Sequence, residues 1–353
     1  MVKTWKQLLA LSLCPLMALS GFAACGAAPT PTTEPSATEP APTEPVPTEP
    51  EAEAKVLKVL TLGSSSTVDA CHMLNRILAV QGVGKYDEVI VGTLYYSGCK
   101  LSQHIQFMME NSPQYRLYLS SSANPDQPPK ITEGVTMEAA LRQDYWDIIF
   151  LQAAGGELDN DIAFTSGYVK ALQNYVNQKK HNPLAYFGWH FTCVPPTDPD
   201  LMNSYPYSPN PYKTAYDQYN HDRTACFNAR AERIGKYVFT DETIRLTICS
   251  ITAVQNACTS YLGEKDLYRD YTHSTDLGRV MTAYVWYCRL MGIEKLEEVK
   301  LDHIPKAFLK STKDKTQDRL ITDAEKAIIL ESVNNALAHP LEITQSQYTQ
   351  APN

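Results

Sequence analysis

Residues 56–66 read Val-Leu-Lys-Val-Leu-Thr-Leu-Gly-Ser-Ser-Ser and are followed by apolar residues at helical spacing between Ala70 and Leu78. A short, nearly continuous apolar run is typical of a strand that is buried on both faces. The glycine and serines that end the run indicate a tight loop, and the spacing beyond them predicts a helix. We therefore expect a strand, a loop and a helix, with the serines at the carboxyl end of the strand.

Four further apolar segments have the length and composition of strands, and helical patterns separate most of them. They are Val89–Tyr96, Asp147–Leu151, Leu184–Trp189 and Ile244–Ile248. Strands that alternate with helices predict an α/β fold in three layers: a doubly wound, flavodoxin-like arrangement with a mostly parallel five-stranded sheet. Ligands of such sheets bind beyond the carboxyl ends of the strands.

Three other segments complete the expected order of elements. The Tyr-, Ser- and Pro-rich residues 114–135 are a candidate hairpin insertion, and one long helix is expected from Thr214 to Lys236. A capping box beginning at Thr322 predicts a last helix that ends near Leu337 and packs against the domain.

The composition limits the classes of function. The 353 residues contain 31 Lys and Arg against 39 Asp and Glu, a net charge of −8, which argues against a nucleic-acid-binding protein that relies on neutralising phosphates. Hydrophobic residues make up 44% of the chain, so most of it is expected to fold. The nine cysteines are scattered without a Cys-x-x-Cys pair, which predicts neither a disulfide framework nor a cysteine-based zinc site.

The first 24 residues have the layout of a signal peptide. Two lysines precede an apolar run over residues 8–24, and small residues come directly before Cys25, as in the bacterial lipobox. Cleavage there would make Cys25 the first residue and place a lipid on its thiol. Cys14 competes with it but follows a bulky leucine, and an uncut anchor is marginal because the run is short and interrupted by polar residues and a proline. Both interpretations predict an extracytoplasmic protein, and Cys25 predicts one that is lipid-anchored to the bacterial cell membrane.

A repeated Thr-Glu-Pro phrase follows the signal peptide and contains no basic or aromatic residue. Such a composition stays extended and hydrated. The predicted organisation is a signal peptide over 1–24, a disordered linker over 25–54, a folded domain over 55–300 and a helical extension over 301–353.

Two short motifs lie where this fold would place a catalytic site. Gly63-Ser64-Ser65 follows the first strand, and Asp270-Tyr271-Thr272-His273 lies between the last two predicted helices of the domain. A serine hydroxyl becomes an effective nucleophile when an imidazole takes its proton and a carboxylate on the other ring nitrogen orients that imidazole. Asp270 and His273 can supply both groups from one loop, so the two motifs together predict a serine hydrolase.

In these blocks the chain resembles the SGNH/GDSL hydrolases, and more closely an SGNH-like bacterial branch classed as a domain of unknown function. The resemblance implies an SGNH-type fold with Ser65 as the nucleophile and with Asp270 and His273 completing the triad. It also implies an oxyanion hole made of the backbone N–H groups of Ser65 and Gly98 and the side-chain amide of Gln152.

The first block departs from the pattern of that superfamily. Ser64 stands where an Asn or Asp is usual, and three consecutive serines leave open whether Ser64 or Ser66 is the nucleophile in place of Ser65. Capping of the following helix is the alternative role for Ser64 and Ser66.

The resemblance and the surface location together imply a serine esterase that removes acetyl or similar groups from carbohydrate. Its substrate would be a small-molecule or glycan ester, and it would need neither a metal nor an organic cofactor. The alternative is a non-catalytic surface protein that keeps the fold and binds glycan in the same cleft. Loss of the Asn or Asp from the first block favours the alternative, whereas the intact Asp270 and His273 favour the esterase.

Several other side chains are candidates for such a site. Cys71 and His72 are a thiol and a base, but neighbours in a helix point about 100° apart and are not expected to share a proton. His190 ends the fourth predicted strand and could line the pocket or pack in the core. Five tyrosines in and after a Pro-rich loop could stack on sugar rings or hold the loop in place. They are Tyr205, Tyr207, Tyr212, Tyr216 and Tyr219.

Overall fold

A computed structural model describes residues 54–205, 210–302, 304 and 319–351 of the chain. The predicted signal peptide, the candidate lipidation site Cys25 and the linker up to residue 53 lie outside the described residues.

Seven strands form one sheet in the order β4-β3-β2-β1-β5-β6-β7. The strands are β1 (Val56–Gly63), β2 (Glu88–Tyr95), β3 (Tyr115–Ser121), β4 (Lys130–Val135), β5 (Ile148–Leu151), β6 (Tyr186–His190) and β7 (Ile244–Ile248). The five predicted strands are β1, β2, β5, β6 and β7, and they pair in parallel. The expected α/β fold with a mostly parallel, flavodoxin-like sheet is therefore confirmed.

The number of strands differs from the expected five because the segment 114–135 joins the sheet. It forms a hairpin whose strand β3 pairs antiparallel with β2 and whose strand β4 pairs antiparallel with β3. Without the hairpin, β2 would be an edge strand with unpaired backbone groups. The new edge, β4, is exposed along most of its length, which is why its sequence carries no strong apolar signal.

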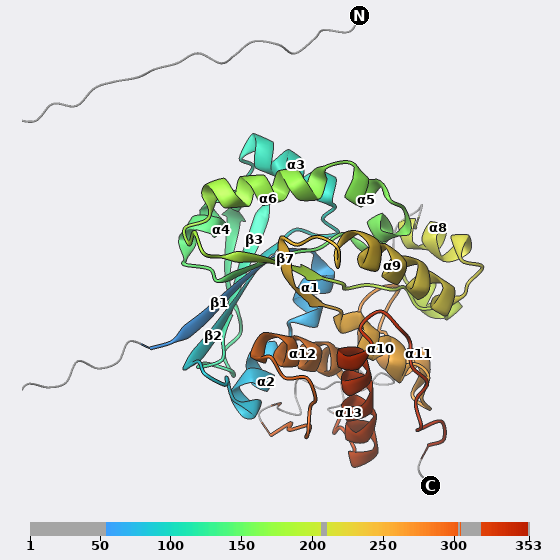
Figure 1. Cartoon of the computed structure of the whole chain (residues 1–353). Coiled ribbons are helices and arrows are strands. Elements are labelled where there is room, and N and C mark those ends of the chain that lie inside the picture. The colour runs from blue at the N-terminus through green and yellow to red at the C-terminus, as the bar shows by residue number, and fades with distance from the viewer. Residues whose placement is uncertain (1–53, 206–209, 303, 305–318, 352–353) are drawn as a thin grey trace, which may run out of the picture. The chain divides into compact units, whose positions relative to one another are not determined.

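Helices cover both faces of the sheet. They are α1 (Ser65–Ala70), α2 (Leu74–Gln81), α3 (Leu101–Glu110), α4 (Met137–Gln143), α5 (Ile162–Thr165), α6 (Tyr168–Lys179), α7 (Pro199–Met202), α8 (Pro211–Gln218), α9 (Arg223–Tyr237), α10 (Ser250–Ala257), α11 (Gly263–Leu267), α12 (Asp276–Met291) and α13 (Asp323–Ala338), with a 3₁₀ turn over Gly155–Asp159. In Figure 1, α3, α4 and α6 lie together on one side of the sheet, and α1, α2 and α12 lie on the other.

The long helix expected from Thr214 to Lys236 is two helices, α8 and α9. Asn220 and His221 between them have φ values of 51° and 62°, which no α-helix accommodates. The side chain of Asp222 then caps α9 by accepting hydrogen bonds from two backbone N–H groups at the start of that helix.

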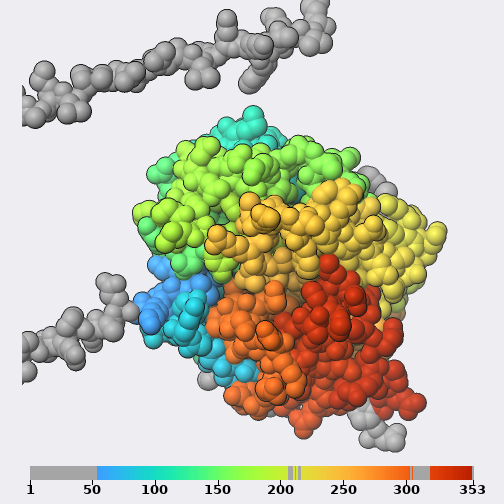
Figure 2. All heavy atoms as spheres, in the orientation of Figure 1, coloured from blue at the N-terminus to red at the C-terminus, as the bar shows by residue number. Residues whose placement is uncertain are grey.

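The C-terminal helix forms where the capping box predicts it. The Thr322 side chain accepts a hydrogen bond from the backbone N–H of Glu325, and the Glu325 carboxylate accepts one from the backbone N–H of Thr322. Helix α13 packs against α10 and α12, and Figure 2 shows the red C-terminal segment directly against the orange one.

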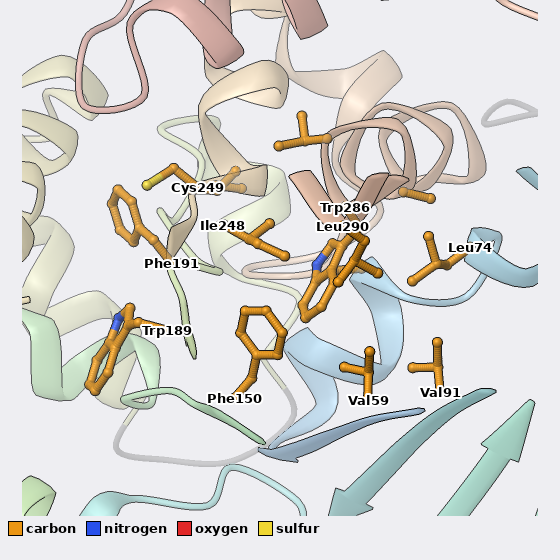
Figure 3. Close-up of a cluster of buried hydrophobic side chains, with 14 of the residues drawn as sticks. Val59, Leu74, Val91, Phe150, Trp189, Phe191, Ile248, Cys249, Trp286 and Leu290 are labelled. Carbon is orange, nitrogen blue, oxygen red and sulfur yellow. The ribbon is translucent and has the colours of Figure 1, made fainter. Parts of the chain in front are cut away.

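Helix α12 packs in the core against the sheet. Its first residue, Asp276, is three positions after His273, so this packing positions the loop that carries His273. Phe150 on β5 and Trp286 on α12 are neighbours in the core (Figure 3), and their ring centroids are 4.7 Å apart. The indole N–H of Trp286 donates to Nε2 of His190 at 3.1 Å. Burial lowers the pKa of His190 to about 3, so this ring is a neutral core residue. His190 is not among the residues that line the cavity described below. Among the described residues, no helix is both long and apolar enough to cross a membrane.

Candidate active site

The turn after β1 brings the serines to the carboxyl edge of the sheet. Gly63 ends β1, and a Cβ atom on it would lie 2.6 Å from Oγ1 of Thr67, so only glycine allows α1 to begin so close to the strand. Ser64 is the N-cap residue, and its carbonyl accepts hydrogen bonds from the N–H groups of Thr67 and Val68. Ser65 is therefore the first residue of α1.

The three serines have different surroundings. Ser64 is 4% exposed, and its hydroxyl accepts a hydrogen bond of 2.7 Å from Nε2 of Gln152. Ser65 lines a cavity of about 710 Å³, whereas Ser64 and Ser66 do not. Of the serines that the sequence left open as nucleophiles, Ser65 is the one that faces a space large enough for a substrate.

Gln152 lies beneath this turn. The residue is 1% exposed, Thr67 donates a hydrogen bond to its Oε1, and its Nε2 donates to Ser64. Gln152, the expected oxyanion donor, is thus joined to the turn through Ser64. Gln152 is not among the residues that line the cavity.

Asp270 and His273 form a hydrogen-bonded pair on the loop between α11 and α12. Both carboxylate oxygens of Asp270 contact Nδ1 of His273, at 2.9 and 3.0 Å. One of these oxygens also accepts the backbone N–H groups of Thr272 and His273, which fixes the side chain locally. Because Nδ1 faces the carboxylate, Nε2 of His273 is the nitrogen that remains for the cavity, which His273 lines.

The pKa of Asp270 is lowered. Burial alone would raise it, but the hydrogen bond and charge of His273, together with the two backbone N–H groups, outweigh burial. A carboxylate that stays ionised in this position can stabilise an imidazolium on His273.

This lowered pKa predicts a pH-dependent contribution to stability. The pKa of the folded state lies below that of the unfolded chain, so the stabilisation is complete above about pH 4 and is lost as the pH falls through the folded-state value. Asp270→Asn should lower the free energy of unfolding by about 1 kcal/mol at pH 7, and the loss should shrink toward pH 3. Urea unfolding at both values measures it. Asp200→Asn, at a carboxylate that is 86% exposed, is the control, and an equal loss at both pH values for Asp270→Asn would contradict the prediction.

Gly98 stands in a turn that lines the same cavity. Its φ of 59° belongs to the left-handed region that favours glycine, and the turn leads into α3. The sequence pattern did not indicate Glu157, whose carboxylate accepts the backbone N–H groups of Leu101 and Ala154. Glu157 thereby ties the Gly98 turn to the loop after β5, and burial raises the pKa of its carboxyl group against the effect of these N–H groups.

Tyrosines form much of the cavity wall. Tyr95, Tyr168, Tyr205, Tyr212 and Tyr271 line it. The ring of Tyr271 lies 4.7 Å from that of Tyr205 and 4.9 Å from that of Tyr212. Of the five tyrosines singled out from the sequence, Tyr205 and Tyr212 line the cavity.

The other tyrosines of that set have different positions. The Tyr216 hydroxyl donates to the carbonyl of Thr197, and that of Tyr219 donates to Asp159, so both hold loops in place. Tyr207 lies outside the described residues. Within the described ranges, no group of three or more His, Cys, Asp and Glu side chains is placed to hold a metal ion.

Cys71 is partly buried and His72 is exposed, and the two do not form a reactive thiol and base. Loss of contact with water raises the pKa of the Cys71 thiol, so the thiol stays protonated at neutral pH and is a poor nucleophile.

The pairing of a Gly-Ser-Ser turn with an Asp-x-x-His loop lies within a segment that matches a known family. Residues 58–307 match the family described as a domain of unknown function, DUF4886. The chain belongs to the DUF4886 family. A crystal structure of a DUF4886 protein from Bacteroides uniformis has the same fold, with a TM-score of 0.66, 21% sequence identity and coverage of 84% of this chain and all of that one.

A second solved structure is less similar to the present chain. It is a protein from Slackia heliotrinireducens provisionally assigned as an SGNH hydrolase, with a TM-score of 0.39, 16% identity and coverage of 67% of this chain and 99% of that one. A search of the curated proteins found no match to the present chain.

Proposed function

We propose that this protein is a serine ester hydrolase in which Ser65 is the nucleophile, His273 the general base and Asp270 the residue that orients His273. One observation carries the proposal. Residues 65 and 273, more than 200 positions apart in the sequence, line one cavity, and Asp270 binds Nδ1 of His273, which leaves Nε2 for proton transfer. The resemblance of both motifs to those of SGNH hydrolases supports the same roles.

The reaction would proceed through an acyl-enzyme. The Ser65 hydroxyl attacks the ester carbonyl while Nε2 of His273 takes its proton, and the charged imidazolium is stabilised by Asp270. His273 then gives the proton to the leaving alcohol as the C–O bond of the ester breaks. A water molecule, activated by the same imidazole, releases the acid from Ser65.

Backbone N–H groups would stabilise the oxyanion that forms at each step. Ser65 and Gly98 both line the cavity, and the resemblance gives their N–H groups this role. We propose that Gln152 acts on the oxyanion hole by holding Ser64, and with it the turn that sets the direction of the Ser65 N–H.

Carbohydrate is the substrate class that we propose, with acetyl or a similarly small acyl group removed. Five tyrosines line the cavity together with serine hydroxyls and an asparagine amide. Tyrosine rings stack on the apolar faces of sugars while hydroxyl and amide groups bind sugar hydroxyls. A cavity of about 710 Å³ has the size of a typical small-ligand site.

A non-catalytic glycan-binding protein is the second candidate. Among the described residues, no hydrogen bond joins the Ser65 hydroxyl to His273, and the tyrosine-lined cavity would serve binding equally well. In unliganded hydrolases, however, the catalytic hydrogen bonds are often long and tighten only when substrate is bound.

Hydrolysis assays separate the two candidates. We expect the folded domain to release nitrophenol from a short-chain nitrophenyl ester and acetate from acetylated oligosaccharides, and Ser65→Ala to lower both activities by about 10³-fold or more. Binding of the oligosaccharides with no release of acetate by the unaltered protein would favour the second candidate.

We propose that the protein is exported and lipid-anchored at Cys25, on the basis of the signal-peptide layout. Mass analysis of the mature N-terminus should then find Cys25 as the first residue, carrying a diacylglycerol. A Cys25→Ser variant should stay unprocessed, whereas Cys14→Ser should be processed normally. Cleavage elsewhere, or an unmodified Cys25, would contradict the proposal.

A further inference from the structure

We propose that Asp69 is a positioning residue of this hydrolase, because it binds Nη1 of Arg269 and so limits Arg269 to a long contact with Asp270, which leaves Asp270 hydrogen-bonded to His273. The inference rests on the proposed function. Asp69 lies on α1, in the helix that begins at Ser65, and neither the family nor the sequence motifs assign it a role.

Asp69 is a buried carboxylate with three donors. The residue is 6% exposed, and its oxygens accept hydrogen bonds from Nη1 of Arg269 at 2.7 Å, from Nε of Arg279 at 2.7 Å and from the backbone N–H of Ser274 at 2.8 Å. Arg269 and Ser274 flank the segment that carries Asp270 and His273. A single side chain of the nucleophile helix thus holds both ends of the loop that carries the base.

Charges of alternating sign run through this cluster. Asp270 lies 3.8 Å from Nε of Arg269, and Arg269 binds Asp69. Asp69 also binds Arg279, whose Nη1 donates to Asp276 at 2.7 Å. The exposed imidazole of His72 also lies near this row: desolvation and the charge of Arg279 lower its pKa, whereas Asp69 and Asp276 raise it.

The two arginines would respond differently to the loss of Asp69. Arg279 keeps a second carboxylate, Asp276. The carboxylate nearest to Arg269 would then be Asp270, which has to orient His273. A guanidinium binds a carboxylate in two parallel hydrogen bonds and is a strong competitor for it. Without Asp69, Arg269 would therefore take Asp270 from the imidazole and leave the general base misoriented.

Asp69→Asn keeps the size of the side chain and removes its charge. We expect kcat to fall about 10- to 100-fold with KM changed less than about threefold, since misplacing a catalytic group affects the reacting geometry more than substrate binding. Arg269→Gln alone should leave kcat within about threefold, and Asp69→Asn combined with Arg269→Gln should recover most of the lost kcat, because the competitor is gone. Asp276→Asn, which removes a carboxylate that binds Arg279, is the matched control.

A proton NMR measurement tests the same inference without turnover. The Nδ1–H of His273 bound to Asp270 should give a low-field signal, assigned by its loss in His273→Ala. The signal should disappear in Asp69→Asn and return in the double variant, even if the protein hydrolyses no ester and the proposed function fails. A double variant that folds but stays as impaired as Asp69→Asn, an unchanged signal in Asp69→Asn, or an Arg269→Gln variant as inactive as His273→Ala would each overturn the inference. If Asp69→Asn does not fold, the Arg269→Gln and His273→Ala variants and the double variant still test the inference.

Discussion

Ser65→Ala is expected to lower kcat for a short-chain nitrophenyl ester by about 10³-fold or more, as loss of a triad member does in serine hydrolases. Ser65 is the first residue of α1 and lines the cavity with His273, so its hydroxyl has no replacement in the turn. Activity that remains would come from the oxyanion hole and from substrate binding alone.

The neighbouring serines supply matched controls for this substitution. Ser66→Ala should leave kcat within a few-fold, because Ser66 is absent from the cavity wall. Ser64→Ala removes a hydrogen bond with Gln152 and should cost about 1 kcal/mol of stability, with a smaller loss of activity than Ser65→Ala. All three variants must be folded by circular dichroism. Loss of activity in Ser64→Ala or Ser66→Ala, with Ser65→Ala active, would place the nucleophile at a different serine.

His273→Ala is expected to have an effect of similar size, and the two substitutions should not add. Without the imidazole, the Ser65 hydroxyl has no base, so the serine that remains contributes little. The variant with both substitutions should therefore be about as active as either single variant, because residues of one triad act as a unit.

Kinetics of the two single variants and the double variant measure this coupling. Tyr271→Phe is a suitable control, since it changes another residue of the same loop and cavity wall while keeping the ring. Effects of Ser65→Ala and His273→Ala that multiply in the double variant would mean that the two residues act independently, which the proposed mechanism does not allow.

The strands that form the site could be predicted from the sequence because they are buried on both faces. Strands β1 and β5 have near-continuous apolar runs, and the loops after them carry the Gly-Ser-Ser turn and Gln152. The hairpin β3–β4 could be expected only as an insertion, because β4 is exposed and has no apolar period. The break between α8 and α9 has no signal in the sequence, because Asn220 and His221 adopt left-handed conformations within a segment of helical composition.

The site itself was only partly visible in the sequence. The motifs indicated Ser65, Gly98 and His273, which line one cavity, and Asp270, which binds His273. The burial of Gln152 under the turn depends on the distance between the β1 and β5 loops, which no spacing in the sequence gives. Asp69 and Glu157 bind backbone groups far away in the chain, and an acidic residue within the short helix α1 was the only local signal for Asp69.

Labelling with a fluorophosphonate tests the central claim most directly, because this reagent forms a covalent bond only with an activated serine. The folded domain, its Ser65→Ala variant and its His273→Ala variant would be treated alike, and the modified peptide would be mapped by mass spectrometry. We predict one adduct on Ser65 of the unaltered protein and none on either variant. An adduct on Ser64 or Ser66, equal labelling of the His273→Ala variant, or no labelling of the unaltered protein would contradict the assignment of Ser65 and His273 as nucleophile and base.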